Sequence, residues 1–186
     1  MKSEMLEKDR SALLLIDVQD RLFPHIHERQ SMLARIDLLI SAANLMKIPV
    51  LATEQYPKGL GKTIEQISRA IPNLQPLEKL DFSCLAATGF KDRLAAIRRP
   101  QVVLTGIETH VCVTQTALDL IAHGEEVFIV ADATGSRRAL DAEIALRRLD
   151  HAGAIIMTAE SVVFEWLRRA GTDVFKALQP NLKALA

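Results

Sequence analysis

The sequence contains few cysteines, few aromatic residues and no excess of charge of either sign. Its two cysteines, Cys84 and Cys112, are too few for a disulfide framework. The simplest expectation is therefore a cytoplasmic protein with both thiols reduced. The 23 lysines and arginines balance 23 aspartates and glutamates, so no overall positive field is available to hold a nucleic-acid backbone. The aromatic content of 4% also weighs against a nucleic-acid enzyme.

Long apolar runs are absent as well. No run approaches the ~20 residues that span a bilayer, and residues 1–10 are charged and lack the apolar core of a signal peptide. The sequence therefore predicts no membrane partner. Its 186 residues fit one ordinary domain, and 49% apolar with 25% charged residues is an average globular composition. We expect a single domain over residues 1–186.

Short apolar runs alternate with longer segments of helical periodicity. The predicted strands cover residues 11–16, 49–53, 77–80, 101–105, 126–131 and 154–157. The predicted helices cover residues 31–46, 63–71, 90–98, 111–123, 137–152, 160–169 and a tail from 172, and a capping box of Thr63 and Gln66 opens the second. This alternation indicates βαβ units, and continuously apolar strands indicate helices on both faces. The prediction is an α/β sandwich of three layers around a six-stranded parallel sheet.

The residues that follow the strands are the candidates for function, because ligands bind beyond the carboxyl ends of such strands. They are Asp17, residues 53–55, Lys79 with Asp81, residues 106–112 and Asp132.

Cys112 lies in the first turn of a predicted helix that directly follows a strong strand. With Thr109 as the predicted N-cap, the free amides and the helix dipole would lower the pKa of this thiol. The same amides would bind the oxyanion of a tetrahedral intermediate. The alternative is that Cys112 is a small buried apolar residue, which free cysteine usually is.

Asp17 and Lys79 favour the functional interpretation. Asp17 ends an apolar strand, and it flanks a crevice together with Cys112 if the first and fourth strands are neighbours. Lys79 would add a cation at the same rim. Taken alone, Asp17 fits a helix cap or an ion pair, and Lys79 fits a solvated side chain. His110 is a rival partner for Cys112, but two residues apart on a helix the two side chains point in different directions.

Ordered motifs stand along residues 11–157. They are Leu14-Leu15-Ile16-Asp17-Val18-Gln19, Lys79 ahead of Phe82-Ser83, Gly106-Ile107-Glu108-Thr109-His110-Val111-Cys112-Val113, and Val130-Ala131-Asp132-Ala133 followed by Ser136-Arg137. These motifs resemble those of the isochorismatase-like cysteine hydrolases. The stretch at residues 53–61 is most similar to the isochorismatase-domain-containing subgroup, which includes proteins labelled mitochondrial-associated ribonuclease.

The resemblance implies a Rossmann-like sheet in the order 3-2-1-4-5-6 and a catalytic triad of Asp17, Lys79 and Cys112. Cys112 would attack an amide carbonyl and form a thioester-type intermediate. Asp17 would take the thiol proton and return it to the leaving amine, while Lys79 would hold the pair in charged form. The backbone amides of Glu108 and Cys112 would form the oxyanion hole, the first aimed by a cis peptide between Ile107 and Glu108.

One departure bears on the cofactor. Nicotinamidases carry an Asp-x-His-x-x-His metal site after the second strand, whereas residues 54–62 contain no histidine. We therefore expect no metal and no other cofactor. Cys112 in turn argues against the enol-ether reaction of true isochorismatases, which often replace the cysteine. The leading hypothesis is a hydrolase of a small amide or related C–N bond. Gln19, Phe23 and Phe82 are candidates for the substrate pocket, with core packing as the alternative for both phenylalanines.

Two other functions stay open at this stage. One is a noncatalytic oligomeric scaffold of the same fold, and the other is a ribonuclease-like activity. The family commonly assembles through helices that flank the sheet, so the resemblance implies a homo-oligomer, a dimer or larger, with a small-molecule substrate. The candidate contact is the apolar tail, with packing on its own domain as the alternative: Val174, Phe175, Leu178, Leu182 and Leu185.

Overall fold

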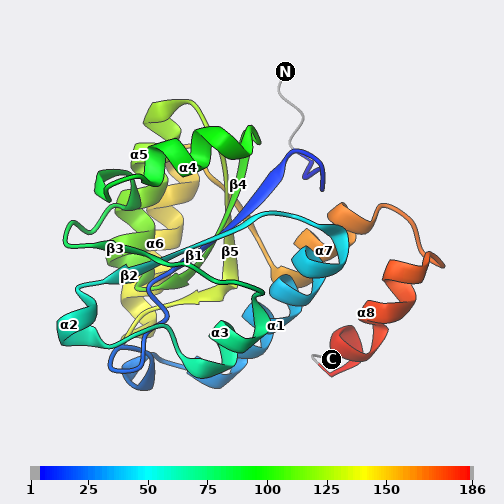
Figure 1. Cartoon of the computed structure of the whole chain (residues 1–186), viewed down its shortest axis with the longest axis horizontal. Coiled ribbons are helices and arrows are strands. Elements are labelled where there is room, and N and C mark those ends of the chain that lie inside the picture. The colour runs from blue at the N-terminus through cyan, green and yellow to red at the C-terminus, as the bar shows by residue number, and fades with distance from the viewer. Residues whose placement is uncertain (1–4, 185–186) are drawn as a thin grey trace.

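The computed structural model describes residues 5–184, so residues 1–4 of the charged N-terminal segment and Leu185 of the apolar tail lie outside the described residues. Six strands form one parallel sheet in the order β3-β2-β1-β4-β5-β6 (Figure 1). The predicted fold and strand order are confirmed. The strands are β1 (Ser11–Ile16), β2 (Val50–Gln55), β3 (Leu77–Lys79), β4 (Gln101–Ile107), β5 (Glu126–Gly135) and β6 (Ile155–Met157).

Helices cover both faces of the sheet (Figure 1). One face carries α1 (Arg29–Met46), α3 (Glu65–Ala70), α7 (Ala159–Leu167) and α8 (Asp173–Lys183), and the other carries α4 (Phe90–Ile97), α5 (Thr114–His123) and α6 (Ala139–His151). Short connecting elements are η1 (Phe23–His25), α2 (Pro57–Leu60), η2 (Cys84–Ala86) and η3 (Thr109–Val113). β1 supplies Leu13 and Leu15 to the first core and Leu14 and Ile16 to the second, because alternate side chains of a strand face opposite sides.

Three strands continue further at their carboxyl ends than the hydrophobic pattern predicts. β2 runs to Gln55, β4 to Ile107 and β5 to Gly135, because the neighbouring strands keep pairing beyond the last apolar residue. Gln55 pairs with Lys79, for example. Residues 53–55 and Asp132 therefore lie within strands and not after them.

The predicted capping box at α3 is wrong. The backbone N–H and the hydroxyl of Thr63 donate to Glu54 Oε1 at 2.7 and 2.8 Å, and α3 begins after Ile64 without a side-chain cap. The buried carboxylate of Glu54 competes successfully for Thr63, because hydrogen bonds to an ionised acceptor are stronger than neutral ones.

β1 and β4 approach each other closely where Ile16 pairs with Gly106. A Cβ on Gly106 would lie 2.1 Å from the carbonyl oxygen of Ile16, and Gly106 has a φ of +108°. We expect Gly106→Ala to lower the free energy of unfolding by about 2–5 kcal/mol, from overpacking and the left-handed backbone together. Gly124→Ala is the matched control, since Gly124 has a φ of +98° and nothing within 4 Å of the added atom. Equal losses for both variants in chemical denaturation would contradict the steric argument.

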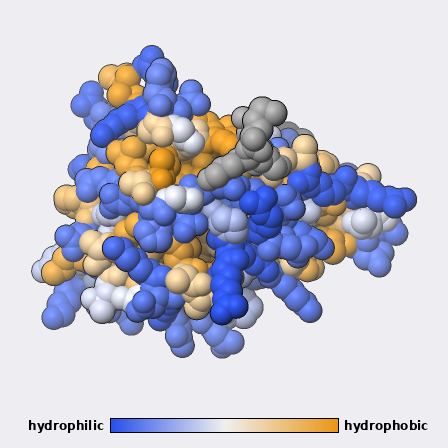
Figure 2. All heavy atoms as spheres, turned by 90° about the horizontal axis from the view of Figure 1, so that it is seen from above, coloured by the Kyte–Doolittle hydropathy of each residue, from blue (hydrophilic) through white to orange (hydrophobic). Residues whose placement is uncertain are grey.

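The surface is mixed in character. Seen from above, charged and polar side chains cover much of it, and apolar residues gather on the left, the side of α4 and α5 (Figure 2). Among residues 5–184, no helix combines the length and the apolar character needed to cross a membrane.

Candidate active site

The three side chains that the sequence singles out meet at the carboxyl edge of the sheet. Asp17 directly follows β1, Lys79 ends β3, and Cys112 lies in η3, the π-helical turn after β4. Lys79 Nζ lies 2.6 Å from Asp17 Oδ2, with both side chains fully buried. Gln55 Oε1 accepts from Lys79 Nζ at 2.6 Å and lies 4.0 Å from Cys112 Sγ. One amide oxygen therefore links the cysteine to the buried ion pair.

The backbone turns sharply at Asp17, where φ is +54°. Aspartate is one of the few residue types besides glycine that adopts this left-handed conformation readily. The carboxylate oxygens both have donors: Oδ1 accepts from the Thr53 hydroxyl at 2.8 Å and Oδ2 accepts from Lys79. Since Thr53 donates to Asp17, its oxygen is free to accept from the thiol of Cys84, whose Sγ is 3.6 Å away.

The three N–H groups of the Lys79 ammonium face Asp17 Oδ2, Gln55 Oε1 and the carbonyl of Phe82 at 3.1 Å, with the Asp81 carbonyl at 3.4 Å. Burial lowers the pKa of Lys79, but the negative charge of Asp17, joined at high pH by that of the neighbouring cysteines once they ionise, outweighs it, so the pKa lies above its usual value. Lys79 is thus a fixed positive charge at neutral pH.

The expected lowering of the Cys112 pKa is wrong. Burial raises the pKa of this thiol and the charge of Asp17 raises it further, while Lys79 opposes them with a smaller effect. A helix dipole lowers the pKa of a thiol in the first turn of an α-helix, and Thr109 was the predicted N-cap of such a turn. Instead the turn is π-helical, and the buried Thr109 hydroxyl has no hydrogen-bond partner among residues 5–184. Cys112 rests as a neutral thiol beside a carboxylate.

The peptide bond between Ile107 and Glu108 is cis. The Glu108 carboxylate accepts from the backbone and side-chain nitrogens of Arg137 at 2.9 and 3.0 Å, and its carbonyl accepts from the amides of Val111 and Val113. Outside the ladder of the sheet, no acceptor for the Glu108 N–H is found in the part of the chain that the structure describes. This amide is a candidate donor to an oxyanion.

Thr53 and Gln55 fall in the candidate range 53–55, although the sequence assigned neither of them a role of its own. They stand two apart on β2, so they lie on the same side of the sheet, and they pair in register with Ile16 and Lys79. The sequence signal for these two residues is the placement of polar side chains at alternate positions at the end of an apolar strand.

The pocket candidates have three different environments. Gln19 is buried, donates to the carbonyls of Gln55 and Gly61 at 3.0 and 2.6 Å, and accepts from the Gln55 amide. Phe23 packs in the core, as the alternative interpretation has it. Phe82 is 50% exposed at the rim of the site.

His110 is not placed to activate Cys112. Its Nδ1 lies 2.9 Å from the hydroxyl of Ser136, a buried residue that follows β5. Among residues 5–184, no group of three histidine, cysteine, aspartate or glutamate side chains is arranged to hold a metal ion.

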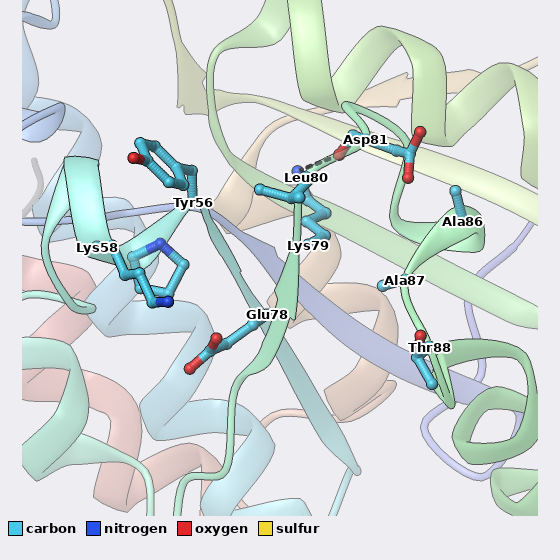
Figure 3. A pocket seen from close by; sticks show the side chains of 10 residues that line it. Tyr56, Lys58, Glu78, Lys79, Leu80, Asp81, Ala86, Ala87 and Thr88 are labelled. Carbon is cyan, nitrogen blue, oxygen red and sulfur yellow. Dashed lines mark hydrogen bonds between the residues drawn. The ribbon is translucent and has the colours of Figure 1, made fainter.

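A cavity of about 420 Å³ lies beside β3, between residues 56–58 and residues 86–88 (Figure 3). The side chain of Lys79 rises toward the Asp81 carbonyl, whereas that of Glu78 points away, toward Lys58 (Figure 3). Leu80, also lining the cavity, is 74% exposed. The Leu80 and Phe82 side chains therefore give the loop above the ion pair an apolar outer surface.

Cys112 is expected to react with iodoacetamide before Cys84. Burial raises the pKa of Cys84 to about 11 and raises that of Cys112 further, which by itself favours Cys84. The prediction therefore depends on access, since Cys112 is 5% exposed and Cys84 is 0% exposed. Because both pKa values are high, labelling should be slow at pH 7 and should still accelerate above pH 8.5, where an ordinary thiol is half ionised. Peptide mapping over a pH series measures both rates. Faster labelling of Cys84, or a plateau near pH 7, would contradict this prediction.

Comparison with known proteins identifies the class. Residues 11–161 match the model of the isochorismatase domain, so the chain belongs to the isochorismatase family. Isochorismatase domain-containing protein 1 of Danio rerio is 40% identical over 177 residues, which are 95% of this chain and 62% of that protein. This chain thus spans less than two thirds of that relative's length.

Solved structures agree with the fold and the family. MAR1 ribonuclease from Caenorhabditis elegans superimposes with a TM-score of 0.90 at 33% identity, covering 96% of this chain and 92% of that chain. The YcaC gene product from Escherichia coli, described as an octameric hydrolase of unknown specificity, has a TM-score of 0.88 at 25% identity, covering 97% and 94%.

Proposed function

We propose that this isochorismatase-family protein is a metal-free cysteine hydrolase that cleaves a small amide or related C–N bond. Residues 1–186 form the single domain that we propose carries this activity. The observation that supports this most is the buried Lys79–Asp17 pair at 2.6 Å, joined to Cys112 through Gln55 Oε1. A nucleophile next to a base that a third group orients is the general arrangement for covalent catalysis.

In the first half-reaction the Cys112 sulfur attacks the amide carbon and its proton passes to Asp17. The carbonyl oxygen becomes an oxyanion, for which the backbone amides of Glu108 and Cys112 are the proposed donors. Collapse breaks the C–N bond, the amine leaves with the proton from Asp17, and a thioester on Cys112 remains. Lys79 holds the Asp17 carboxylate in place through its hydrogen bond and does not itself move a proton.

In the second half-reaction a water molecule attacks the thioester carbon and gives its proton to Asp17. The C–S bond breaks, the carboxylic acid product leaves, and the proton returns to the sulfur of Cys112. The 5% exposure of Cys112 favours small substrates whose carbonyl group can enter a narrow opening.

The test is a panel of small amides and ureas, with Cys112→Ala as the control and intact-protein mass spectrometry to detect the acyl adduct. Hydrolysis by the wild type, an adduct on Cys112 and loss of both in Cys112→Ala are expected. Turnover that survives in Cys112→Ala would contradict the mechanism. No turnover and no adduct across the panel would favour the noncatalytic scaffold.

A ribonuclease-like activity is the second candidate, because the Caenorhabditis elegans neighbour is named a ribonuclease. The zero net charge of this chain argues against it. RNA cleavage that is strong at low salt, weak at high salt and absent in Cys112→Ala would favour it over amide hydrolysis.

We predict a homo-oligomer, a dimer or larger, in line with the octameric Escherichia coli neighbour. The tail is a poor candidate for the contact, because Leu178 is buried in the domain's own core and Phe175 stacks at a tilt on Phe164, with ring centroids 6.4 Å apart. Light scattering at micromolar concentration should give a multiple of 20.6 kDa. A monomeric mass would end this prediction.

A further inference from the structure

The side chain of Gln55 is held in one orientation. Lys79 has only N–H donors, so the Gln55 atom that lies 2.6 Å from its Nζ is the amide oxygen. The amide nitrogen then donates to the Leu80 carbonyl at 2.7 Å. The backbone N–H of Gln55 donates to Gln19 Oε1 at 2.8 Å, and the residue is only 8% exposed. The side-chain amide of Gln55 cannot rotate by 180° without losing the hydrogen bonds of both its oxygen and its nitrogen.

This orientation decides what the Cys112 sulfur faces. Asp17, Gln55 and the Phe82 carbonyl accept from the three N–H groups of Lys79, so a Cys112 thiolate has to compete with them for donation from this lysine. The sulfur also lies 4.0 Å from the Gln55 oxygen, an atom that accepts from a thiol and repels a thiolate.

We propose that Gln55 is a positioning residue that keeps Cys112 protonated at rest, because its Oε1 occupies the Lys79 N–H that would otherwise stabilise the thiolate. The inference rests on the proposed function in taking Cys112 as the nucleophile, although its readout requires no substrate. The strand β2, which carries Gln55, would thereby take part in controlling when the Cys112 thiolate forms.

The charged and titratable groups around Cys112 are consistent with this role. Asp17 comes from the end of β1 and Lys79 from β3, while Cys84 of η2 faces Thr53 and through it Asp17. Burial and the charge of Asp17 raise the pKa of Cys112 above its ordinary value, and Lys79 opposes them. A resting thiol of this kind is slow to react with passing electrophiles, since the thiolate is the reactive form.

The experiment compares Gln55→Met and Gln55→Glu with the wild type. Both substitutions keep the side-chain length and both remove the N–H donor to Leu80, so any loosening of the loop is shared. They differ in what faces Lys79 and Cys112: Met removes the oxygen, whereas Glu keeps it and adds negative charge. The rate of Cys112 alkylation by iodoacetamide is measured from pH 6 to pH 10, with Cys84 mapped in the same samples as the internal control.

At pH 7.5 we expect Cys112 of Gln55→Met to react about tenfold faster than the wild type, which corresponds to a pKa shift of about one unit. Cys112 of Gln55→Glu should react at least about threefold more slowly, and Cys84 should stay slow in all three proteins. If the Met variant does not fold, Gln55→Asn, which withdraws the oxygen by one methylene, should also accelerate the reaction.

Faster alkylation of Cys112 in both Gln55→Met and Gln55→Glu would mean that the site has simply opened, and it would overturn the proposal. Unchanged alkylation rates in both variants would also overturn it. Failure of the amide panel would instead count against the proposed function, and the alkylation rates would still decide the role of Gln55.

Discussion

Asp17→Asn is expected to slow the acylation of Cys112 by about 10²–10⁴-fold and to leave the protein folded. The amide cannot take the thiol proton. It can keep the hydrogen bonds, however, because its oxygen can accept from Lys79 and its nitrogen can donate to the Thr53 hydroxyl, the two groups that now hold the carboxylate. Single-turnover kinetics on a substrate from the amide panel measure the effect.

Thermal melts of the same preparations are the control for folding. If Asp17 serves only to pair with Lys79, stability should fall while the folded fraction keeps its activity. A folded Asp17→Asn protein with an acylation rate near that of the wild type would rule out the triad mechanism.

Lys79→Met is expected to lower the free energy of unfolding by about 3–5 kcal/mol, because it leaves the fully buried carboxylate of Asp17 without a counter-charge. Acylation should fall as well, since Asp17 loses the buried partner that orients its carboxylate. Chemical denaturation at pH 7 measures the first effect and single-turnover kinetics the second.

The double variant with Asp17→Asn and Lys79→Met separates charge from packing. It contains no uncompensated charge, so it should be more stable than Lys79→Met alone despite carrying one more substitution. If instead the two losses add, the stability of the site does not depend on the ion pair.

The parallel sheet was accessible from local features of the sequence, whereas its strand order and the proposed triad followed from the resemblance to one family. Runs such as residues 11–16 mark buried strands, and Asp17, Lys79 and Cys112 each stand at or just beyond a strand's end in motifs that resemble one family. The carboxyl ends of parallel strands share one edge of the sheet, so these residues had to lie near one another.

The contacts of Gln55 and the protonation of Cys112 were not accessible in this way. Gln55 meets Lys79 only because β2 and β3 pair in one particular register, which the composition of either strand does not reveal. The pKa of Cys112 depends on its burial and on Asp17, both properties of the assembled site, whereas the sequence offered only its position at a helix start. Phe23 joined the core for the same reason, since burial is decided by distant segments.

The hydrogen bonds that hold the loop at residues 80–82 are all accepted by its main-chain carbonyls. Gln55 donates to the carbonyl of Leu80, and Lys79 donates to the carbonyls of Asp81 and Phe82. Among residues 5–184, these hydrogen bonds use no side chain of residues 80–82. Substitutions of the exposed Leu80 and Phe82 side chains would therefore change the rim of the proposed site and leave in place the hydrogen bonds that join the loop to Gln55 and the buried lysine.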